Sequence, residues 1–202
     1  MNFNAIYRTL EKNGYYIFSH EDIKSFFPYE KSPNLKKALY RWRKSGWICA
    51  LKKGLYELTY PRDFVIPDMH IANKLYSPSY VSLETALSNY SIIPEVSMAV
   101  TSITTKPTRR FKNRHGLFVY RTIKPEAFKG YYVERQGAFD ILTAEPEKAL
   151  IDYLYFKGLR GKKLDLTGER IDITAVKRLN KRKITDYAKL YNMDMQGLHA
   201  YL

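Results

Sequence analysis

Apolar residues recur at helical spacing near the start of the chain. Over residues 2–12 they share one face, which predicts a first helix. Ser19 is expected to cap a second short helix, with Glu21 and Asp22 in its first turn. Ser32 precedes Pro33 and is expected to cap a third helix, which should end at Ser45-Gly46.

The predicted third helix has an apolar side and a basic side. Apolar residues at positions i, i+3, i+4 and i+7 should pack on the other helices: Leu35, Ala38, Leu39 and Trp42. The apolar runs on either side of Lys52-Lys53-Gly54 predict a β-hairpin. Three helices followed by a basic-tipped hairpin is the order of a winged helix, whose third helix enters the major groove of DNA.

Charge strengthens this interpretation. The chain holds 34 Lys and Arg against 20 Asp and Glu, for a net charge of +14, and seven basic residues but no acidic one lie between Lys36 and Lys53. Such an excess favours polyanions, because neutralised phosphates release their counterions. A run of charge is usually only a solvated surface. Here it falls on the helix and the turn that would meet DNA, which favours contact with double-stranded DNA.

We therefore predict a DNA-binding site made of two groups of residues. The group expected at base edges is Asn34, Lys37, Tyr40 and Arg41. The group expected at phosphates is Lys36, Arg43, Lys44, Lys52 and Lys53.

The rest of the chain mixes helical and strand patterns. Residues 61–67, rich in proline, predict a connector between a winged-helix domain at 1–60 and a second domain at 68–202. The helices expected in the second domain cover residues 68–76 and 79–90, begin again at Pro146, and fill the tail after residue 173. The antiparallel strands expected cover residues 96–104, 116–123, 131–134 and 139–143. The predicted fold class is α+β: an N-terminal winged helix-turn-helix plus a C-terminal mixed domain with an antiparallel sheet and packed helices.

A second basic segment lies at residues 106–114. It contains five basic residues and no acidic one: Lys106, Arg109, Arg110, Lys112 and Arg114. We expect it to be a loop between strands. It is equally compatible with contact to phosphate, to RNA or to an acidic partner, and with simple solvation.

Several segments resemble AbiEi-type antitoxins. The two signature-like segments are Ser79–Leu87 with Ile92–Glu95, and Ala144–Asp152. Further segments occur in the family's order: Lys53–Tyr56, Thr104–Lys106, Arg109–Phe111, Phe118–Arg121 and Phe128–Gly130. The resemblance covers about residues 3–160 as an ordered set.

The resemblance implies an antitoxin and transcriptional regulator of a type IV toxin–antitoxin, or abortive-infection, system. Its winged helix would bind inverted repeats in its own promoter, with two copies on the DNA even where the free protein is a monomer. Its second domain would counter a nucleotidyltransferase-like toxin, without requiring a stable complex. A direct toxin-binding protein is the alternative within this class. The polar members of the signatures are expected to cap helices or to form one ion-pair network: Ser82, Glu84, Glu147, Lys148 and Asp152.

No catalytic motif stands out, so we expect no enzyme activity, metal or cofactor. Glycine-rich phosphate-binding motifs and a Gly-x-Ser-x-Gly motif are missing from the sequence, which has a single cysteine. The histidines are far apart along the chain: His20, His70, His115 and His199. One enzyme alternative is a metal-dependent nuclease that uses Asp140, Glu145, Glu147 and Lys148, although the last two are expected to start a helix.

Hydropathy predicts a cytoplasmic protein without a membrane partner. The longest apolar runs are far below the roughly 18 residues that a spanning helix needs. The first ten residues contain Arg8 and other polar residues, and a small-residue cleavage site does not follow them.

Overall fold

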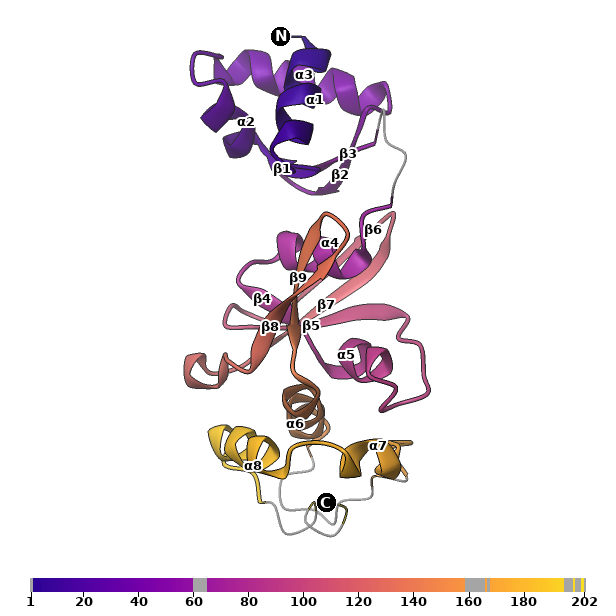
Figure 1. Cartoon of the computed structure of the whole chain (residues 1–202). Helices are drawn as coiled ribbons and strands as arrows, with labels where there is room; N and C mark the ends of the chain where they lie inside the picture. Colours follow the sequence, from indigo (N-terminus) through magenta and orange to yellow (C-terminus); the bar gives the residue numbers. More distant parts are fainter. Residues whose placement is uncertain are drawn as a thin grey trace. The chain divides into compact units, whose positions relative to one another are not determined.

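The chain folds into two compact α+β units. The computed structural model describes residues 2–59, 65–158, 166, 168–194, 198 and 201. The first unit comprises Met1–Ile66 with Asn113–His115, and the second comprises Pro67–Lys112 with Gly116–Leu202 (Figure 1). The predicted connector at 61–67 falls largely outside the described residues. Within them, no helix combines the length and the apolar character needed to cross a membrane.

The first unit combines helices with a small antiparallel sheet (Figure 1). Its elements in chain order are α1 (Phe3–Lys12), β1 (Ile17–Ser19), α2 (His20–Phe26), α3 (Ser32–Lys44), β2 (Ile48–Lys52) and β3 (Leu55–Leu58). The three strands lie in the order β1-β3-β2, and both neighbouring pairs are antiparallel. The hairpin expected from the sequence is therefore present. β1 was not expected, because three residues are too few to establish an alternating pattern.

Capping explains where the helices begin. The Ser19 hydroxyl accepts a hydrogen bond from the Asp22 amide (3.1 Å), and the Asp22 carboxylate accepts one from the Ser19 amide (2.6 Å), which forms a capping box. The expected cap at Ser32 was wrong. α3 begins at Ser32 itself, and Lys31 occupies the cap position without a side-chain hydrogen bond. Pro33 is tolerated there because amides in the first turn have no partner within the helix.

The apolar side of α3 is buried, as its spacing predicted. Its buried residues are Leu35, Ala38, Leu39 and Trp42, which belong to one core with Phe3, Ile6 and Leu10 of α1 and Ile23 of α2. This packing fixes the rotation of α3 about its own axis.

The second unit is built on one sheet with helices on both faces. Its elements are α4 (Asp68–Leu75), β4 (Ser79–Val81), α5 (Leu83–Asn89), β5 (Ala99–Thr104), β6 (Arg109–Asn113), β7 (Gly116–Thr122), the 3-10 helix η1 (Pro125–Ala127), β8 (Tyr131–Gln136), β9 (Phe139–Ala144), α6 (Pro146–Phe156), α7 (Ile173–Lys177) and α8 (Lys181–Leu190). The six strands lie in the order β6-β7-β5-β4-β9-β8. β5 pairs in parallel with β7, and β4 with β9, whereas the β4–β5 and β8–β9 pairs are antiparallel. The sheet is mixed, not antiparallel as expected.

Two segments differ from the sequence prediction. The helix expected over residues 79–90 is strand β4 followed by α5. Tyr80 and Val81 are fully buried, and β4 pairs with β5 on one side and β9 on the other. Their backbone N–H and C=O groups are therefore satisfied by neighbouring strands and not within a helix. The loop expected over 106–114 contains β6 at the sheet edge. The spacing of apolar residues and a basic composition are local features, so they do not predict pairing between strands that are far apart in the sequence.

A buried polar cluster joins both signature-like segments. Lys148 and Asp152 lie one turn apart on α6, are fully buried and form an ion pair. The Asp152 carboxylate also accepts hydrogen bonds from the hydroxyls of Ser82 (2.8 Å), Tyr80 (3.1 Å) and Tyr191 (2.5 Å). Of the polar signature residues, Ser82, Lys148 and Asp152 thus form a network.

Burial makes this cluster costly unless it is complete. Loss of solvent lowers the pKa of the Lys148 amine, and the Asp152 carboxylate opposes that shift by favouring the charged form. Burial and the same carboxylate raise the pKa of the Tyr80 hydroxyl, which therefore remains a hydrogen-bond donor. Within the part of the chain that the structure describes, Lys148 and Asp152 are thus satisfied by each other and by neighbouring hydroxyls.

We expect Asp152→Ala to destabilise the protein by about 3–5 kcal/mol, because Lys148 would be left buried without its counter-charge. The measurement is urea unfolding followed by circular dichroism. The control is Asp186→Ala, which removes the exposed pair with Lys189 (3.3 Å) and should cost less than about 1 kcal/mol. Equal losses in the two variants would contradict a structural role for the cluster.

Candidate nucleic-acid interface

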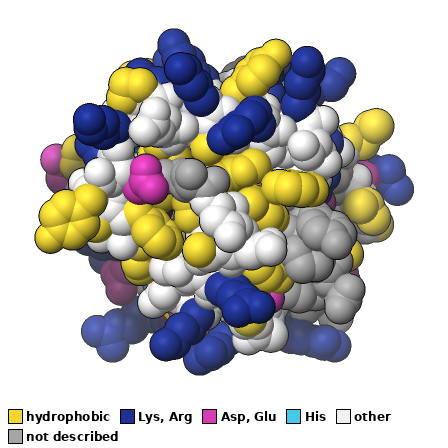
Figure 2. All heavy atoms as spheres, turned by 90° about the horizontal axis from the view of Figure 1, so that it is seen from above, with side chains coloured by type: hydrophobic (Ala, Val, Ile, Leu, Met, Phe, Trp, Pro, Cys, Tyr) yellow, Lys and Arg dark blue, Asp and Glu magenta, His cyan; other side chains and the backbone are white. Residues whose placement is uncertain are grey.

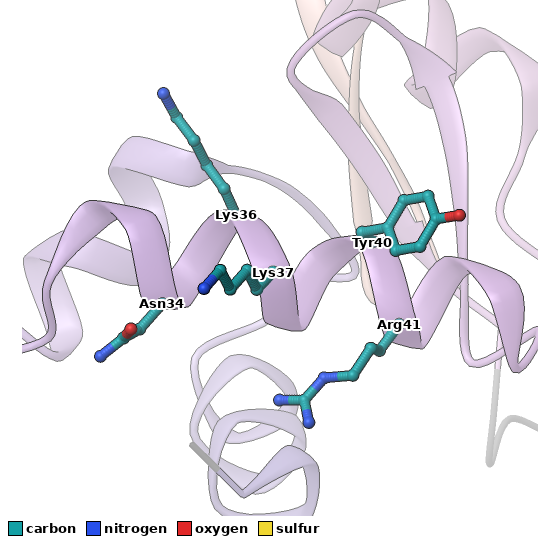
Figure 3. A pocket seen from close by; sticks show the side chains of 5 residues that line it. All are labelled: Asn34, Lys36, Lys37, Tyr40 and Arg41. Carbon is teal, nitrogen blue, oxygen red and sulfur yellow. The ribbon is translucent and has the colours of Figure 1, made fainter.

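The polar side of α3 is open to solvent. Tyr40 is 57% exposed. The other exposed residues on this side are Asn34, Lys36, Lys37, Arg41, Arg43 and Lys44. Figure 3 shows Lys36 pointing away from one side of the helix, and Asn34 and Arg41 from the other. Since the apolar side is held in the core, α3 presents these polar groups together.

Two hollows follow the exposed side of α3. One is lined by Asn34, Lys36, Lys37, Tyr40 and Arg41 (Figure 3). The other lies toward the hairpin and is lined by His20, Glu21, Ser32, Lys36, Leu39, Tyr40, Arg43, Lys53, Gly54 and Tyr56. Lys36 and Tyr40 line both hollows, so α3 and the hairpin turn contribute to one continuous surface. We call it the α3–hairpin surface.

The hairpin turn contributes one of its two lysines to this surface. Gly54 has a φ of 81°, a left-handed conformation that favours glycine and reverses the chain between β2 and β3. Lys53 beside it is exposed and lines the second hollow. Lys52 ends β2 and is only partly exposed. The expected pair of tip lysines is therefore unequal.

The electrostatic character of the α3–hairpin surface is positive. Among the described residues that line its hollows, Glu21 is the one acidic side chain, and it lies 3.7 Å from His20. The Lys44 amine lies 5.9 Å from the centre of the Tyr40 ring, within range of a cation–π contact. Figure 2 shows Lys and Arg side chains gathered along two edges of the face seen from above, with hydrophobic side chains between them.

The donors on this surface suit nucleic acid. Lys and Arg donate charge-assisted hydrogen bonds to phosphate oxygens, and a guanidinium or a side-chain amide can pair with two atoms of one base edge. The nine residues predicted from the sequence all lie on α3 or the hairpin. His20, Glu21 and Tyr56 were missed, because they come from α2 and β3 and reach the second hollow only through the tertiary arrangement.

The second basic set does not form one patch. The Lys106 amine and the Arg109 guanidinium lie 5.5 and 5.8 Å from the centre of the Tyr76 ring. Arg110 lines a different hollow. Arg114 belongs to the first unit, where it donates a hydrogen bond to the buried Glu57 carboxylate at 3.0 Å. The fifth residue, Lys112, is exposed at the end of β6.

Three of the four residues of the nuclease alternative are engaged in other contacts. Glu145 accepts hydrogen bonds from the Lys183 amine (2.9 Å) and the Tyr187 hydroxyl (2.7 Å). Glu147 is buried in α6 and accepts one from the Asn180 amide (2.9 Å). Lys148 belongs to the buried cluster, while Asp140 is exposed on β9. In the described part of the chain, no three His, Cys, Asp or Glu residues are grouped as metal ligands, and His199 lies outside that part.

Comparisons with known proteins leave the family open. No model of a protein family matches the chain, and no curated protein matches it. Its function is therefore inferred from the chemistry of the α3–hairpin surface and from the sequence resemblance described above.

The cations of α3 should contribute little to folding. We expect the double variant Lys37→Ala/Arg41→Ala to change the free energy of unfolding by no more than about 0.5 kcal/mol, because both side chains are exposed. The comparison variant is Leu35→Ala on the opposite side of α3, where a buried side chain is truncated at a cost of about 2–5 kcal/mol. Urea unfolding monitored by the fluorescence of the chain's two tryptophans, Trp42 and Trp47, measures both. A large loss in the double variant would mean that the basic residues support the fold.

Proposed function

We propose that the first unit is a winged helix and that the protein is a sequence-specific repressor of its own promoter. The observation that carries the proposal is the continuous cationic surface of α3 and the hairpin turn, with Glu21 as its one acidic lining residue among those described. In a winged helix the third helix lies in the major groove, and the hairpin tip reaches the neighbouring backbone. The observed order of helices and strands is compatible with that arrangement.

The α3 residues would divide the work of recognition. Asn34, Lys37 and Arg41 follow one another at spacings of three and four along α3 and would face base edges with Tyr40. The group assigned to phosphates is Lys36, Arg43, Lys44, Lys52 and Lys53. Two copies would occupy an inverted repeat, one on each half-site.

The antitoxin role is proposed for the second unit. It rests on the resemblance to AbiEi-type antitoxins, which implies that this unit counters a nucleotidyltransferase-like toxin. The two signature-like segments meet in the buried cluster, where Ser82 of the first contacts Asp152 of the second. Their polar residues would then maintain the fold of the antitoxin unit, and the contacts that neutralise the toxin would come from its surface.

Binding to duplex DNA tests the repressor role. We expect Lys37→Ala/Arg41→Ala to weaken binding to the promoter's inverted repeat more than to a scrambled duplex. The slope of log Kobs against log salt should fall by about 2 if both cations neutralise a phosphate charge, and by less if they contact bases alone. Fluorescence anisotropy over a series of salt concentrations measures affinity, slope and specificity together.

The matched control is Arg8→Ala/Lys12→Ala, which removes two exposed positive charges from α1 in the same unit. It should retain most of the affinity and all of the sequence preference. Loss of binding in the control equal to that in the α3 variant would leave only net charge as the cause and would contradict the assigned surface.

Separation of the two roles tests the antitoxin proposal. We expect the α3 double variant to lose repression of a promoter fusion but still to restore growth of cells that express a neighbouring nucleotidyltransferase-like toxin. Reporter activity and growth in the same strain give both readouts. If the α3 variant loses rescue while its abundance is unchanged, neutralisation depends on DNA binding and the division of roles is wrong.

A further inference from the structure

The second unit contains a groove that DNA binding by α3 does not use. Its walls come from α5, from the start of β5, from β6 and β7, and from the end of α6. The lining residues that determine its chemistry are Glu84, Met98, Arg110, Leu117, Val119 and Arg121. We call it the β7 groove.

Strand alternation explains how the β7 groove forms. Phe118 and Tyr120 are buried, and the Tyr120 hydroxyl donates to the Ala72 carbonyl of α4 (2.6 Å). Leu117, Val119 and Arg121 must therefore point to the opposite face of the sheet. That face is covered incompletely, because Leu117 is 36% exposed and Val119 is partly exposed. The groove thus has an aliphatic floor.

The charges at its rim are mostly positive. Arg110, Arg121 and Lys157 line the groove together with Glu84, the single acidic residue among its described lining. Lys157 is paired with Glu169 (2.9 Å). Among the described residues, no acidic side chain forms an ion pair with Arg110 or Arg121. These two guanidinium groups would attract a partner that carries carboxylates.

Apolar surface continues past one end of the groove. Met98 is 99% exposed and lines the β7 groove, while Val96, 86% exposed and two residues earlier in the chain, lines a second hollow with Ile93, Pro94 and Ile173. Large apolar side chains that are exposed to water are unfavourable, and a group of them that lie next to one another marks an interaction site. Residues 96–98 thus contribute to two hollows, which fits an elongated segment better than a compact small molecule.

The chemistry of the floor favours protein over nucleic acid. A single strand of RNA or DNA would stack its bases on open aromatic faces. The exposed floor here is aliphatic, and the one partly exposed ring, Phe156, already has the Arg121 guanidinium 5.9 Å from its centre. Aliphatic side chains with a cationic rim suit an amphipathic helix with leucine-like residues on one side and carboxylates beside them.

We propose that the β7 groove binds an acidic amphipathic helix of a partner protein. Apolar side chains of that helix cover Leu117, Val119 and Met98, and its carboxylates pair with Arg110 and Arg121. The site is separate from the α3–hairpin surface, so it does not depend on the proposed role in DNA binding.

A synthetic peptide tests this site in the full-length protein. The probe is a fluorescein-labelled helix with leucines along one face and glutamates on the other. We expect saturable binding with a dissociation constant below about 0.1 mM. Peptides with the same composition in scrambled order, or with glutamine in place of glutamate, should bind at least about tenfold more weakly, because one loses the apolar face and the other loses the charge.

Variants locate the binding. Arg110→Glu/Arg121→Glu should weaken the peptide complex by about tenfold or more, and Met98→Ser should weaken it without altering stability, since that side chain is almost fully exposed. Lys181→Glu/Arg182→Glu, which makes the same charge change at exposed positions at the start of α8, should have little effect. Circular dichroism confirms that each variant is folded.

Three results would overturn the proposal. The first is absence of saturation. The second is equal weakening by the α8 control. The third is displacement of the peptide by single-stranded RNA with loss of RNA binding in the groove variant, which would assign the groove to nucleic acid. The same variants are tested on promoter DNA. Arg110→Glu/Arg121→Glu should lose peptide binding and retain DNA binding, whereas Lys37→Ala/Arg41→Ala should show the reverse. That pattern would separate this site from the α3–hairpin surface.

Discussion

Burial of the apolar side of α3 is the interaction on which the proposed interface depends. Leu35, Leu39 and Trp42 insert into the core shared with α1 and α2, and this fixes the rotation of the helix. Because the helix backbone sets the directions of all its side chains, holding the apolar side in the core also sets the direction of the residues on the opposite side. The cations of α3 are therefore presented as a set by the packing of the opposite side.

The second unit differs from the first because it buries two charged side chains in its core. It buries Lys148 and Asp152 in the core and satisfies them with tyrosine and serine hydroxyls. Paired in this way, they join β4, α6 and the segment after α8, and they add no charge to the surface. The surface of this unit is then defined by other residues, among which Arg110 and Arg121 border an aliphatic floor.

These two arrangements suggest different partners for the two units. The α3–hairpin surface is rich in hydrogen-bond donors and is hollowed beside an exposed helix, which suits a polyanion. The β7 groove combines apolar surface with fewer cations, which suits a protein segment. A regulator with both surfaces would have separate sites for an operator and for a protein, and each could be altered without loss of the other.

The helices and the hairpin of the first unit could be predicted from the sequence, because their signals lie within a few residues, whereas β1 could not. The spacing of apolar residues predicted α3 and its buried side, the Lys-Lys-Gly turn predicted the hairpin, and the gathering of basic residues identified the exposed side. Other features depend on contacts between distant segments and became evident only from the fold. Ser79–Val81 is a strand, and the sheet is mixed. Lys148 is buried, and Arg110 and Arg121 line one groove. Hydrogen bonds between strands and the burial of polar groups depend on segments far apart in the chain, and neither produces a periodic pattern in the sequence.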